Sequence, residues 1–442
     1  MKKTLVKYPF LTEDVEIYEQ DNGHKIVLAH KEGGMVNVSS WVKTGSINET
    51  DTNNGISHFL EHLMFKGTHK HKAGEFDYIL ESKGAIVNAA TWKDYTFYYV
   101  TLPKGENNEN FYKAIELHAD MMIDPVIPDY EMGAPFDIND NNVTDKRERH
   151  VVIEEIRMRK DQPWTKVYNA TNNAMYTSHP YKRDVIGTPE IISQVSQKEI
   201  MNYYRTFYSP QNVTTIIVGD FDSEDILQRV VDNFTWGERP QPPVRNIVPD
   251  KPVEKTVYIE NQANINSSFM MFGFLGPLAK DLKNLICLEI LAIILGEGTS
   301  SRLYINLIEN QEEQIFNLID AENYSFRDGC NFFVQANFNP QYQEKAIDLV
   351  KSEIEKLLHG FTEREIEKAK KKLKSRFACE VETVSEIGET IGYYMTVCDD
   401  LSLAENYLPI CESITNEELI EAAKTYLNLN HAVISILKPE NI

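Results

Sequence analysis

Two histidines and a glutamate that stand close together in the sequence have the spacing of a metal site. His58, Glu61 and His62 form the string His-Phe-Leu-Glu-His. At about 100° per residue on a helix, the two histidines lie within about 40° of each other, and Glu61 lies about 60° to the other side of His58. Two imidazoles one turn apart suit a tetrahedral zinc ion, and the carboxylate beside them suits a general base for a bound water.

A zinc ion that activates water takes a third protein ligand. The downstream candidates are glutamates in residues 147–156 (RERHVVIEEI). Glu148 and Glu155 are seven residues apart and share a helical face, while Glu154 lies about 100° round the helix from Glu155. Spacing alone does not choose between Glu154 and Glu155, and a solvated helix face is the alternative for each. The H-x-x-E-H order is the inverted zincin signature, and its alternative is a helix whose histidines are structural.

Strand and helix patterns alternate along the chain, which predicts a mixed α+β fold. We expect strands where β-branched and aromatic residues run between turn residues, and helices where apolar residues recur every three to four positions. In the first half, the expected strands are 15–18, 25–29, 36–42, 85–91, 95–102 and 213–218, and the expected helices are 56–65, 74–82, 108–122, 144–159, 164–175, 189–207 and 223–233. In the second half, the expected strands are 256–260, 267–274, 315–319, 330–337 and 432–437, and the expected helices are 282–295, 343–358 and 362–386.

The two halves of the chain end alike, which indicates an internal duplication. Residues 195–199 (VSQKE) and 414–418 (ITNEE) match at an offset of 219 residues, and each is an apolar residue followed by a capping box that opens a helix. Residues 237–253 hold five prolines and predict an extended linker. We therefore expect an N-terminal zinc-binding domain at 1–236, the linker at 237–253, and a C-terminal domain of the same fold without a zinc site at 254–442.

Composition excludes several classes of protein. The 442 residues include 45 Lys and Arg against 67 Asp and Glu, a net charge of −22, and no basic patch for nucleic acid is evident. No window approaches the run of about 20 apolar residues that a membrane span needs. Charged residues interrupt any signal-like start, and the five cysteines form no C-x-x-C pair. We expect a cytoplasmic protein that does not bind nucleic acid and has no membrane span.

Residues 58–68 (HFLEHLMFKGT) resemble the pitrilysin/insulinase zinc metallopeptidases, in particular the short-subunit branch that includes mitochondrial processing peptidase. The likeness extends over nearly the whole chain. Further motifs follow in the order that the family has them, at residues 88–91, 98–100, 149–156, 207–212, 218–220 and 298–303.

The resemblance implies a fold and a set of roles. It implies two homologous α/β-roll domains, each a mixed, largely antiparallel sheet flanked by helices, which agrees with the duplication. It also implies one Zn²⁺ per chain, held by His58, His62 and Glu155, with Glu61 as the general base. Glu148 matches an acid that orients the site.

The resemblance also implies a place for the substrate. Asn88, Ala89 and Ala90 match the edge strand against which substrates of the family lie as an added β-strand. Backbone pairing of this kind is tolerant of sequence, and side-chain pockets add preference. The alternative is an ordinary strand with an exposed asparagine.

Two departures from the family pattern bear on function. There are 92 residues between His62 and Glu155, more than is usual in the branch, and the excess lies in the polar residues 131–146, which we expect to form a surface loop. Active members also carry an Arg and a Tyr seven residues apart in the second domain, where this chain has Ile308 and Ile315. We therefore expect a companion subunit of the same family that supplies this pair.

The function predicted from the sequence is that of a zinc-dependent endopeptidase, which hydrolyses peptides or unfolded segments as the zinc-bearing subunit of a heterodimer. The alternative is a non-catalytic structural or peptide-binding subunit of a larger assembly. A complete zinc motif favours catalysis, because a purely structural subunit has no physical need for it.

Overall fold

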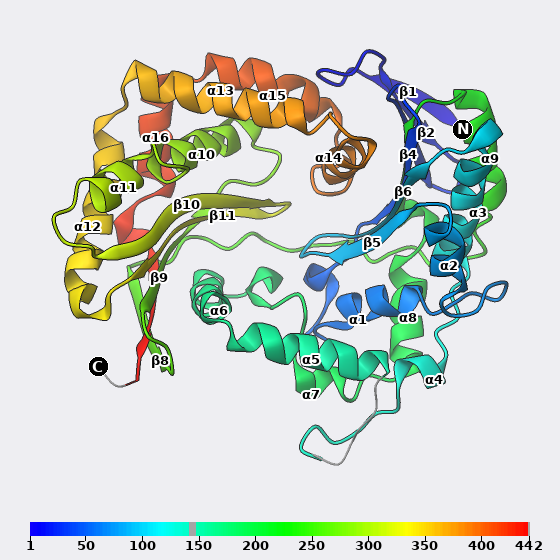
Figure 1. Ribbon diagram of the computed structural model, residues 1–442, viewed down its shortest axis with the longest axis horizontal. Coiled ribbons are helices and arrows are strands. Elements are labelled where there is room, and N and C mark those ends of the chain that lie inside the picture. The colour runs from blue at the N-terminus through cyan, green and yellow to red at the C-terminus, as the bar shows by residue number, and fades with distance from the viewer. Residues whose placement is uncertain (141–146, 441–442) are drawn as a thin grey trace. The chain divides into compact units, whose positions relative to one another are not determined.

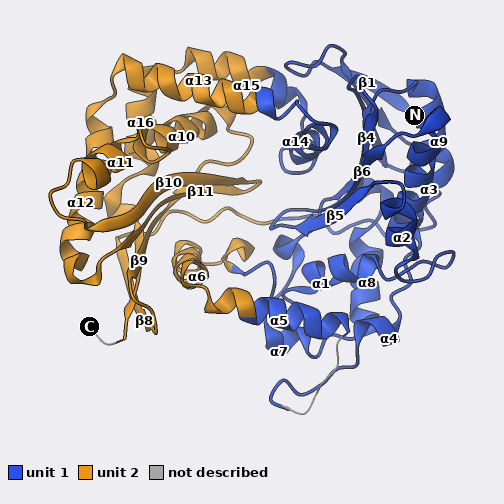
Figure 2. Ribbon diagram, in the orientation of Figure 1, with its two compact units in different colours: residues 1–157, 183–246, 378–405 blue, residues 158–182, 247–377, 406–442 orange. Residues whose placement is uncertain are grey.

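The computed structural model of the chain describes residues 1–140 and 147–440. They form two compact units (Figures 1 and 2). Unit 1 contains residues 1–157, 183–246 and 378–405, and unit 2 contains residues 158–182, 247–377 and 406–442. Among the described residues, no helix has the length and apolar character that crossing a membrane requires.

Unit 1 is built on a seven-stranded sheet in the order β1-β2-β3-β7-β4-β6-β5 (Figure 1). Neighbouring strands are antiparallel except β3 and β7, which are parallel. The strands are β1 (Lys2–Val6), β2 (Val15–Glu19), β3 (Lys25–His30), β4 (Met35–Val42), β5 (Ile86–Thr91), β6 (Thr96–Pro103) and β7 (Val213–Gly219). The central strand β7 is buried along its whole length, whereas β5 lies at the edge of the sheet.

Unit 2 has a five-stranded sheet in the order β10-β11-β9-β12-β8, in which only β12 and β8 are parallel. The strands are β8 (Val257–Ala263), β9 (Ser268–Gly276), β10 (Phe316–Phe326), β11 (Gly329–Phe338) and β12 (Val433–Pro439). The five strands β8-β12-β9-β11-β10 repeat the order and the pair types of β3-β7-β4-β6-β5 in unit 1. The expected fold class, two α+β domains of one plan, is therefore confirmed.

The helices of the two units are as follows. Unit 1 contains α1 (Ile56–Met64), α2 (Glu75–Glu81), α3 (Glu109–Ile123), α4 (Asp129–Met132), α7 (Pro189–Ile192), α8 (Gln197–Phe207), α9 (Ser223–Asn233) and α14 (Val384–Thr396). Unit 2 contains α6 (Pro163–Met175), α10 (Leu282–Leu295), α11 (Arg302–Tyr304), α12 (Gln343–Lys356), α13 (Glu363–Cys379) and α16 (Asn416–Tyr426). Helices α5 (Glu148–Asp161) and α15 (Ser402–Ser413) each run across a boundary between the units, and the last two residues of α13 belong to unit 1.

Each half of the chain contributes one helix to the unit formed mainly by the other half (Figure 2). Helix α6 packs on β9 and β12, and α14 packs on β4 and β7, which hold the corresponding places in the first sheet. In α14, a Cβ on Gly392 would come within 1.9 Å of the Trp41 ring on β4, so only glycine allows this approach. The compact units thus differ from the expected division at residues 236 and 254. Residues 237–253 contain neither helix nor strand.

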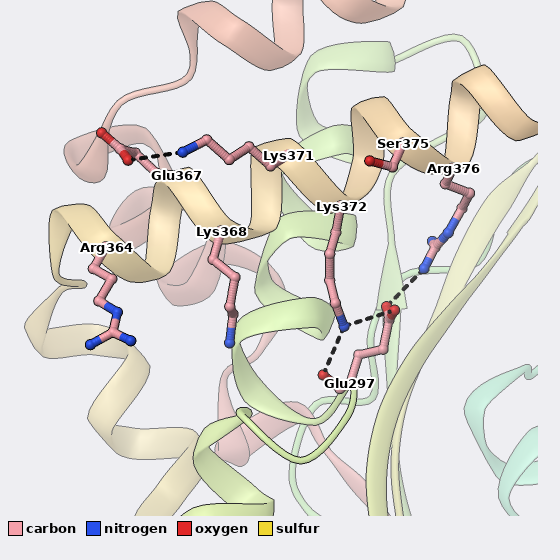
Figure 3. Close-up of a pocket in the computed structure, with 8 residues that line it drawn as sticks. All are labelled: Glu297, Arg364, Glu367, Lys368, Lys371, Lys372, Ser375 and Arg376. Carbon is pink, nitrogen blue, oxygen red and sulfur yellow. Dashed lines mark hydrogen bonds and ion pairs between the residues drawn. The ribbon is translucent and has the colours of Figure 1, made fainter.

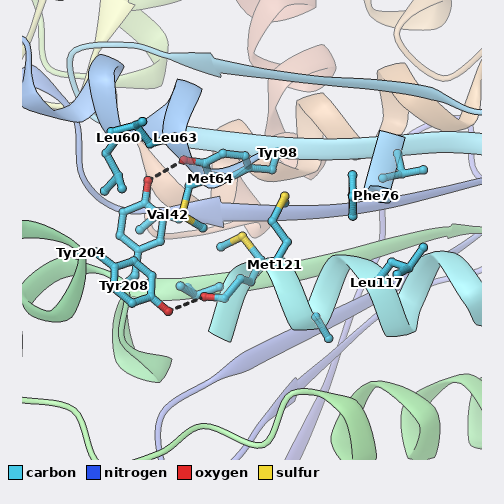
Figure 4. Close-up of a cluster of buried hydrophobic side chains, with 14 of the residues drawn as sticks. Val42, Leu60, Leu63, Met64, Phe76, Tyr98, Leu117, Met121, Tyr204 and Tyr208 are labelled. Carbon is cyan, nitrogen blue, oxygen red and sulfur yellow. Dashed lines mark hydrogen bonds between the residues drawn. The ribbon is translucent and has the colours of Figure 1, made fainter. Parts of the chain in front are cut away.

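Helix α1 is held in unit 1 by its apolar face. Leu60, Leu63 and Met64 are buried in the main hydrophobic cluster, beside Tyr98 and Tyr208 (Figure 4). The two tyrosine hydroxyls share a hydrogen bond of 2.7 Å, which satisfies both inside the core. His58, Glu61 and His62 lie on the less buried side of the same helix.

Two expected helices are each divided in the structure. The expected helix 189–207 is two helices, α7 and α8, because the side chain of Ser196 caps α8. The expected helix 362–386 ends at Cys379, and a capping box at Thr383 opens α14. Strand β1 and helix α15 were not expected. Of the expected loop 131–146, residues 131–132 lie in α4, residues 133–140 contain no helix or strand, and residues 141–146 lie outside the described part.

Candidate metal centre

The start of α1 is fixed by a glycine and a buried carboxylate. Gly55 precedes the helix with a φ of 95°, and a Cβ there would come within 2.7 Å of the Ile186 carbonyl oxygen. Glu49, only 4% exposed, accepts hydrogen bonds from the Gly55 and Ser57 amides (2.8 and 2.9 Å) and from the Asn54 side chain (2.8 Å). Burial raises the pKa of Glu49, and these hydrogen bonds oppose the rise. Glu49 therefore serves as the cap that α1 lacks at Gly55 itself.

Helices α1 and α5 bring two imidazoles and one carboxylate together. The Nε2 atoms of His58 and His62 each lie 3.7 Å from Oε2 of Glu155, and the ligand atoms of the three residues lie within 4.8 Å of one another. Tetrahedral zinc bonds of about 2.0–2.1 Å place ligand atoms about 3.4 Å apart. The donor types and the spacing thus fit a zinc ion with three protein ligands and a fourth position for water.

The adjacent residue Glu154 lies outside this cluster. Its side chain is 61% exposed and pairs with Arg157, one turn further along α5. Glu155 is 38% exposed and is turned toward the histidines of α1. The rotation of α5, whose buried residues are Arg149, Val152, Ile153 and Ile156, thus places Glu155 and not Glu154 beside the histidines. The role of Glu155 as a metal ligand stays a prediction.

Glu148, at the start of α5, orients one of the imidazoles. Its Oε2 lies 3.2 Å from Nδ1 of His62, and its Oε1 accepts an ion-pair hydrogen bond from Lys66 at 2.6 Å. Burial raises the pKa of Glu148, but its contacts with His62 and Lys66 outweigh burial and lower the pKa. The ionised carboxylate favours a proton on Nδ1 of His62, which leaves the Nε2 lone pair on the side of Glu155.

Glu61 lies beside the cluster and is oriented by the edge strand. The hydroxyl of Thr91, at the end of β5, donates a 2.5 Å hydrogen bond to Oε2 of Glu61. Burial raises the pKa of Glu61, and the hydrogen bonds from Thr91 oppose the rise. Burial also lowers the pKa of His62, but the hydrogen bond with Glu148 and the surrounding carboxylates outweigh it and raise the pKa.

The residues expected to meet a substrate lie on β5. Asn88, Ala89 and Ala90 pair with β6 on one side only, since β5 is the edge strand of its sheet. The Asn88 side chain accepts a hydrogen bond from the Ala89 amide at 2.9 Å. In unit 2, Ile308 lies in a π-helical segment, Ile305–Glu309, and Ile315 is fully buried.

Sequence reasoning did not find three residues that support the centre. Each contacts a residue of another segment: Glu49 accepts from the amide of Ser57, Lys66 pairs with Glu148, and Thr91 donates to Glu61. Lys66 and Thr91 lie inside the family motifs at residues 58–68 and 88–91, but the sequence did not show which residues they contact. For Glu49, the only signal was an acid shortly before a glycine that opens a helix.

Comparison with known proteins identifies the family. A sequence model described as insulinase, peptidase family M16, matches residues 25–189, and one described as the peptidase M16 inactive domain matches residues 194–373. The zinc protease PqqE of Helicobacter pylori is 28% identical over 427 residues, which cover 95% of this chain and 91% of that protein. The uncharacterized zinc protease YmxG of Bacillus subtilis is 26% identical over 373 residues, which cover 84% of this chain and 85% of that protein.

Solved structures agree. The crystal structure of a protease from Helicobacter pylori matches with a TM-score of 0.86 and 26% identity, over 99% of this chain and 100% of that one. A peptidase M16 inactive domain from Pseudomonas fluorescens has the same fold, with a TM-score of 0.84 and 17% identity over 96% and 98%. The chain belongs to the insulinase family of zinc peptidases, peptidase family M16. Its place in the branch with mitochondrial processing peptidase stays a prediction.

Proposed function

We propose that the chain is a zinc-dependent endopeptidase that hydrolyses peptides or unfolded segments, and that it acts as the zinc-bearing subunit of a heterodimer. The observation that carries the proposal is the convergence of His58, His62 and Glu155, whose ligand atoms lie within 4.8 Å of one another, beside the half-buried carboxylate of Glu61. Relatives named zinc proteases support the same class of activity.

In this proposal each residue of the centre has a defined part. Zinc, when bound by His58, His62 and Glu155, would make a water molecule acidic and polarise the carbonyl of the peptide bond. Glu61 accepts the proton of that water and passes it to the leaving amine, a role that suits a carboxylate whose pKa burial has raised. Thr91 fixes the orientation of this carboxylate with its hydroxyl.

The substrate is proposed to add as a strand to β5. Edge backbone groups at Asn88, Ala89 and Ala90 would pair with an extended peptide, so recognition rests on main-chain hydrogen bonds more than on any one side chain. A chain must be extended to pair in this way. Folded globular proteins are therefore expected to be poor substrates.

The companion subunit follows from Ile308 and Ile315. Neither side chain can donate a hydrogen bond to a substrate carbonyl or to a developing oxyanion. In the family pattern, the Arg and Tyr at these two positions are the donors. A partner of the same family with an R-x6-Y sequence would supply those donors. The competing proposal, a structural or peptide-binding subunit, rests on the same two isoleucines.

Two substitutions test the centre. Glu61→Gln is expected to retain about one zinc per chain by elemental analysis while hydrolysis of unfolded peptides is abolished, because no metal ligand is lost. Glu155→Ala is expected to lose both metal and hydrolysis. Retained hydrolysis in Glu61→Gln would contradict the general base.

The companion is tested by mixing. We expect slow hydrolysis by the isolated chain and a large gain when a family member that carries R-x6-Y is added. Full activity of the isolated chain would contradict the heterodimer, and saturable peptide binding without cleavage in the mixture would favour the non-catalytic alternative.

A further inference from the structure

A pocket in unit 2 concentrates positive charge in a strongly acidic chain. It lies between α13 and the loop after α10, has a volume of about 540 Å³, and is drawn in Figure 3. Its lining residues are Glu297, Arg364, Glu367, Lys368, Lys371, Lys372, Ser375 and Arg376. Five basic and two acidic side chains give it a net charge of +3, whereas the whole chain has −22.

Four of these cations form one row on α13. Arg364, Lys368, Lys372 and Arg376 follow at intervals of four residues, about 6 Å apart along the helix axis. In Figure 3, Arg364, Lys368 and Lys372 point from the same side of the helix. Like charges at this spacing destabilise a helix. A row of this kind therefore favours an anion that lies against it.

The second half of the row already has its anion. Glu297 accepts from Arg376 at 2.8 Å and from Lys372 at 3.3 Å. The other acid of the pocket, Glu367, lies 3.5 Å from Lys371. Both carboxylates that line the pocket are thus paired with cations other than Arg364 and Lys368.

The first half of the row has no carboxylate partner. Among the described residues, Arg364 makes no ion pair or hydrogen bond, and Lys368 donates only to the carbonyl and hydroxyl oxygens of Ser300, at 2.7 and 3.2 Å. The nearby acid Glu365 is engaged by Arg302 through two hydrogen bonds. Burial and the charges of Lys372 and Arg364 lower the pKa of Lys368, as expected where positive charge is in excess.

We propose that this pocket binds a phosphate group that bridges Arg364 and Lys368. The guanidinium of Arg364 can bind two phosphate oxygens at once, Lys368 adds a compact charge, and the Ser300 hydroxyl adds a hydrogen bond. A phosphate monoester carries a charge of about −1.5 to −2 at neutral pH, so one group neutralises both cations, whereas a single carboxylate neutralises one. The proposal concerns unit 2 alone and does not depend on the metal centre.

The pocket is open to solvent and has room for a ligand larger than phosphate itself. About 540 Å³ lies within the range of about 300–1,000 Å³ found for small-molecule sites. The remaining space could take further phosphates of a chain, placed along the row toward Lys372, or the sugar and base of a nucleotide. The chemistry shared by these ligands is the phosphate group.

Calorimetric titration of the full chain tests the proposal, with orthophosphate, triphosphate and AMP as the probes. Arg364→Gln/Lys368→Gln is expected to weaken binding of the tightest probe about tenfold or more, because two charge-assisted contacts are lost. Lys374→Gln, which removes one positive charge at an exposed position of the same helix and so matches Arg364→Gln in charge, is expected to change it less than about twofold. Tightest binding of triphosphate would indicate a phosphate chain, and tightest binding of AMP would indicate a nucleotide.

Three results would overturn the proposal. The first is that the unaltered chain binds none of the probes. The second is that the double variant binds the tightest probe as well as the unaltered chain does. The third is that Lys374→Gln loses as much affinity as the double variant, which would show only a general charge effect. An oligoglutamate peptide is titrated in parallel. If the unaltered chain bound this peptide but none of the phosphates, and the double variant did not bind the peptide, the pocket would be assigned to acidic peptides. If the double variant melts at a lower temperature, Arg364→Gln alone repeats the test, since the described structure gives Arg364 no partner to lose.

Discussion

The hydrogen bond between Glu148 and His62 gives a graded prediction for zinc affinity. Glu148 lies 3.2 Å from the Nδ1 atom of His62 and 2.6 Å from Lys66, and its pKa is lowered, so it is a carboxylate at neutral pH. Loss of such a supporting partner typically weakens metal binding about 10–100-fold, which is about 1.4–2.7 kcal/mol. Glu148→Gln keeps an oxygen that can accept from Nδ1, so we expect a loss near tenfold. Glu148→Ala keeps none, so we expect a loss nearer a hundredfold.

The assay is competition for zinc against a chromophoric chelator, with the folded state of each variant checked by circular dichroism. Glu154→Gln is the matched control, because Glu154 is on the same helix, is exposed and contacts only Arg157 among the partners found for it. Glu155→Gln marks the other limit, the loss of a ligand. If Glu148→Ala bound zinc as tightly as Glu154→Gln does, the orienting part of Glu148 would be refuted.

Two further predictions concern stability. Glu49→Ala is expected to lower the free energy of unfolding, measured in urea, by about 2–4 kcal/mol, because it leaves buried amides at the start of α1 without an acceptor. Glu49→Gln should lower it less, since an acceptor oxygen remains. Equal losses in the two variants would contradict the capping argument. Burial raises the pKa of Glu365, but hydrogen bonds from Arg302 and Thr362 outweigh it and lower the pKa to about 2. A depressed carboxyl pKa stabilises the folded state above the usual value near 4.5, and this contribution is lost as the pH falls toward 2. Glu365→Gln should therefore destabilise the protein by about 1–2 kcal/mol at pH 7, allowing for partial exposure, and progressively less below pH 4.5; an effect independent of pH would contradict this origin.

Local patterns predicted several helices of unit 1 closely. The helix expected at 56–65 is α1 at Ile56–Met64, and the helix expected at 223–233 is α9 with those bounds. These segments have clear apolar periods and clear stop signals, so local sequence alone determines them. The capping boxes expected at Ser196 and Thr415 are both present, and they mark the start of equivalent helices in the two halves.

What sequence reasoning missed depends on contacts between distant residues. No local pattern shows that Thr91 would lie against Glu61, since the two residues come from a strand and a helix separated by another helix. The break at residues 380–383 was missed because its flanks both have helical character, and only the cap at Thr383 interrupts them. Spacing alone left Glu154 and Glu155 open, and only the family resemblance favoured Glu155; in the structure, the burial of Val152 and Ile156 sets the rotation of α5 that turns Glu155 toward the histidines.

Because α6 and α14 each pack in the unit formed mainly by the other half of the chain, the order of synthesis on the ribosome has a consequence for folding. All seven strands of the first sheet have been translated by residue 219, but the helix that covers β4 and β7 begins only at Val384. At about 5–20 residues per second, that sheet waits on the order of 10–30 s for its cover. During this time the face that α14 later covers, which includes Asn37, Ser39 and Trp41 of β4, is exposed to chaperones and to other nascent chains. A gene cut at the proline-rich segment would leave this exposure permanent.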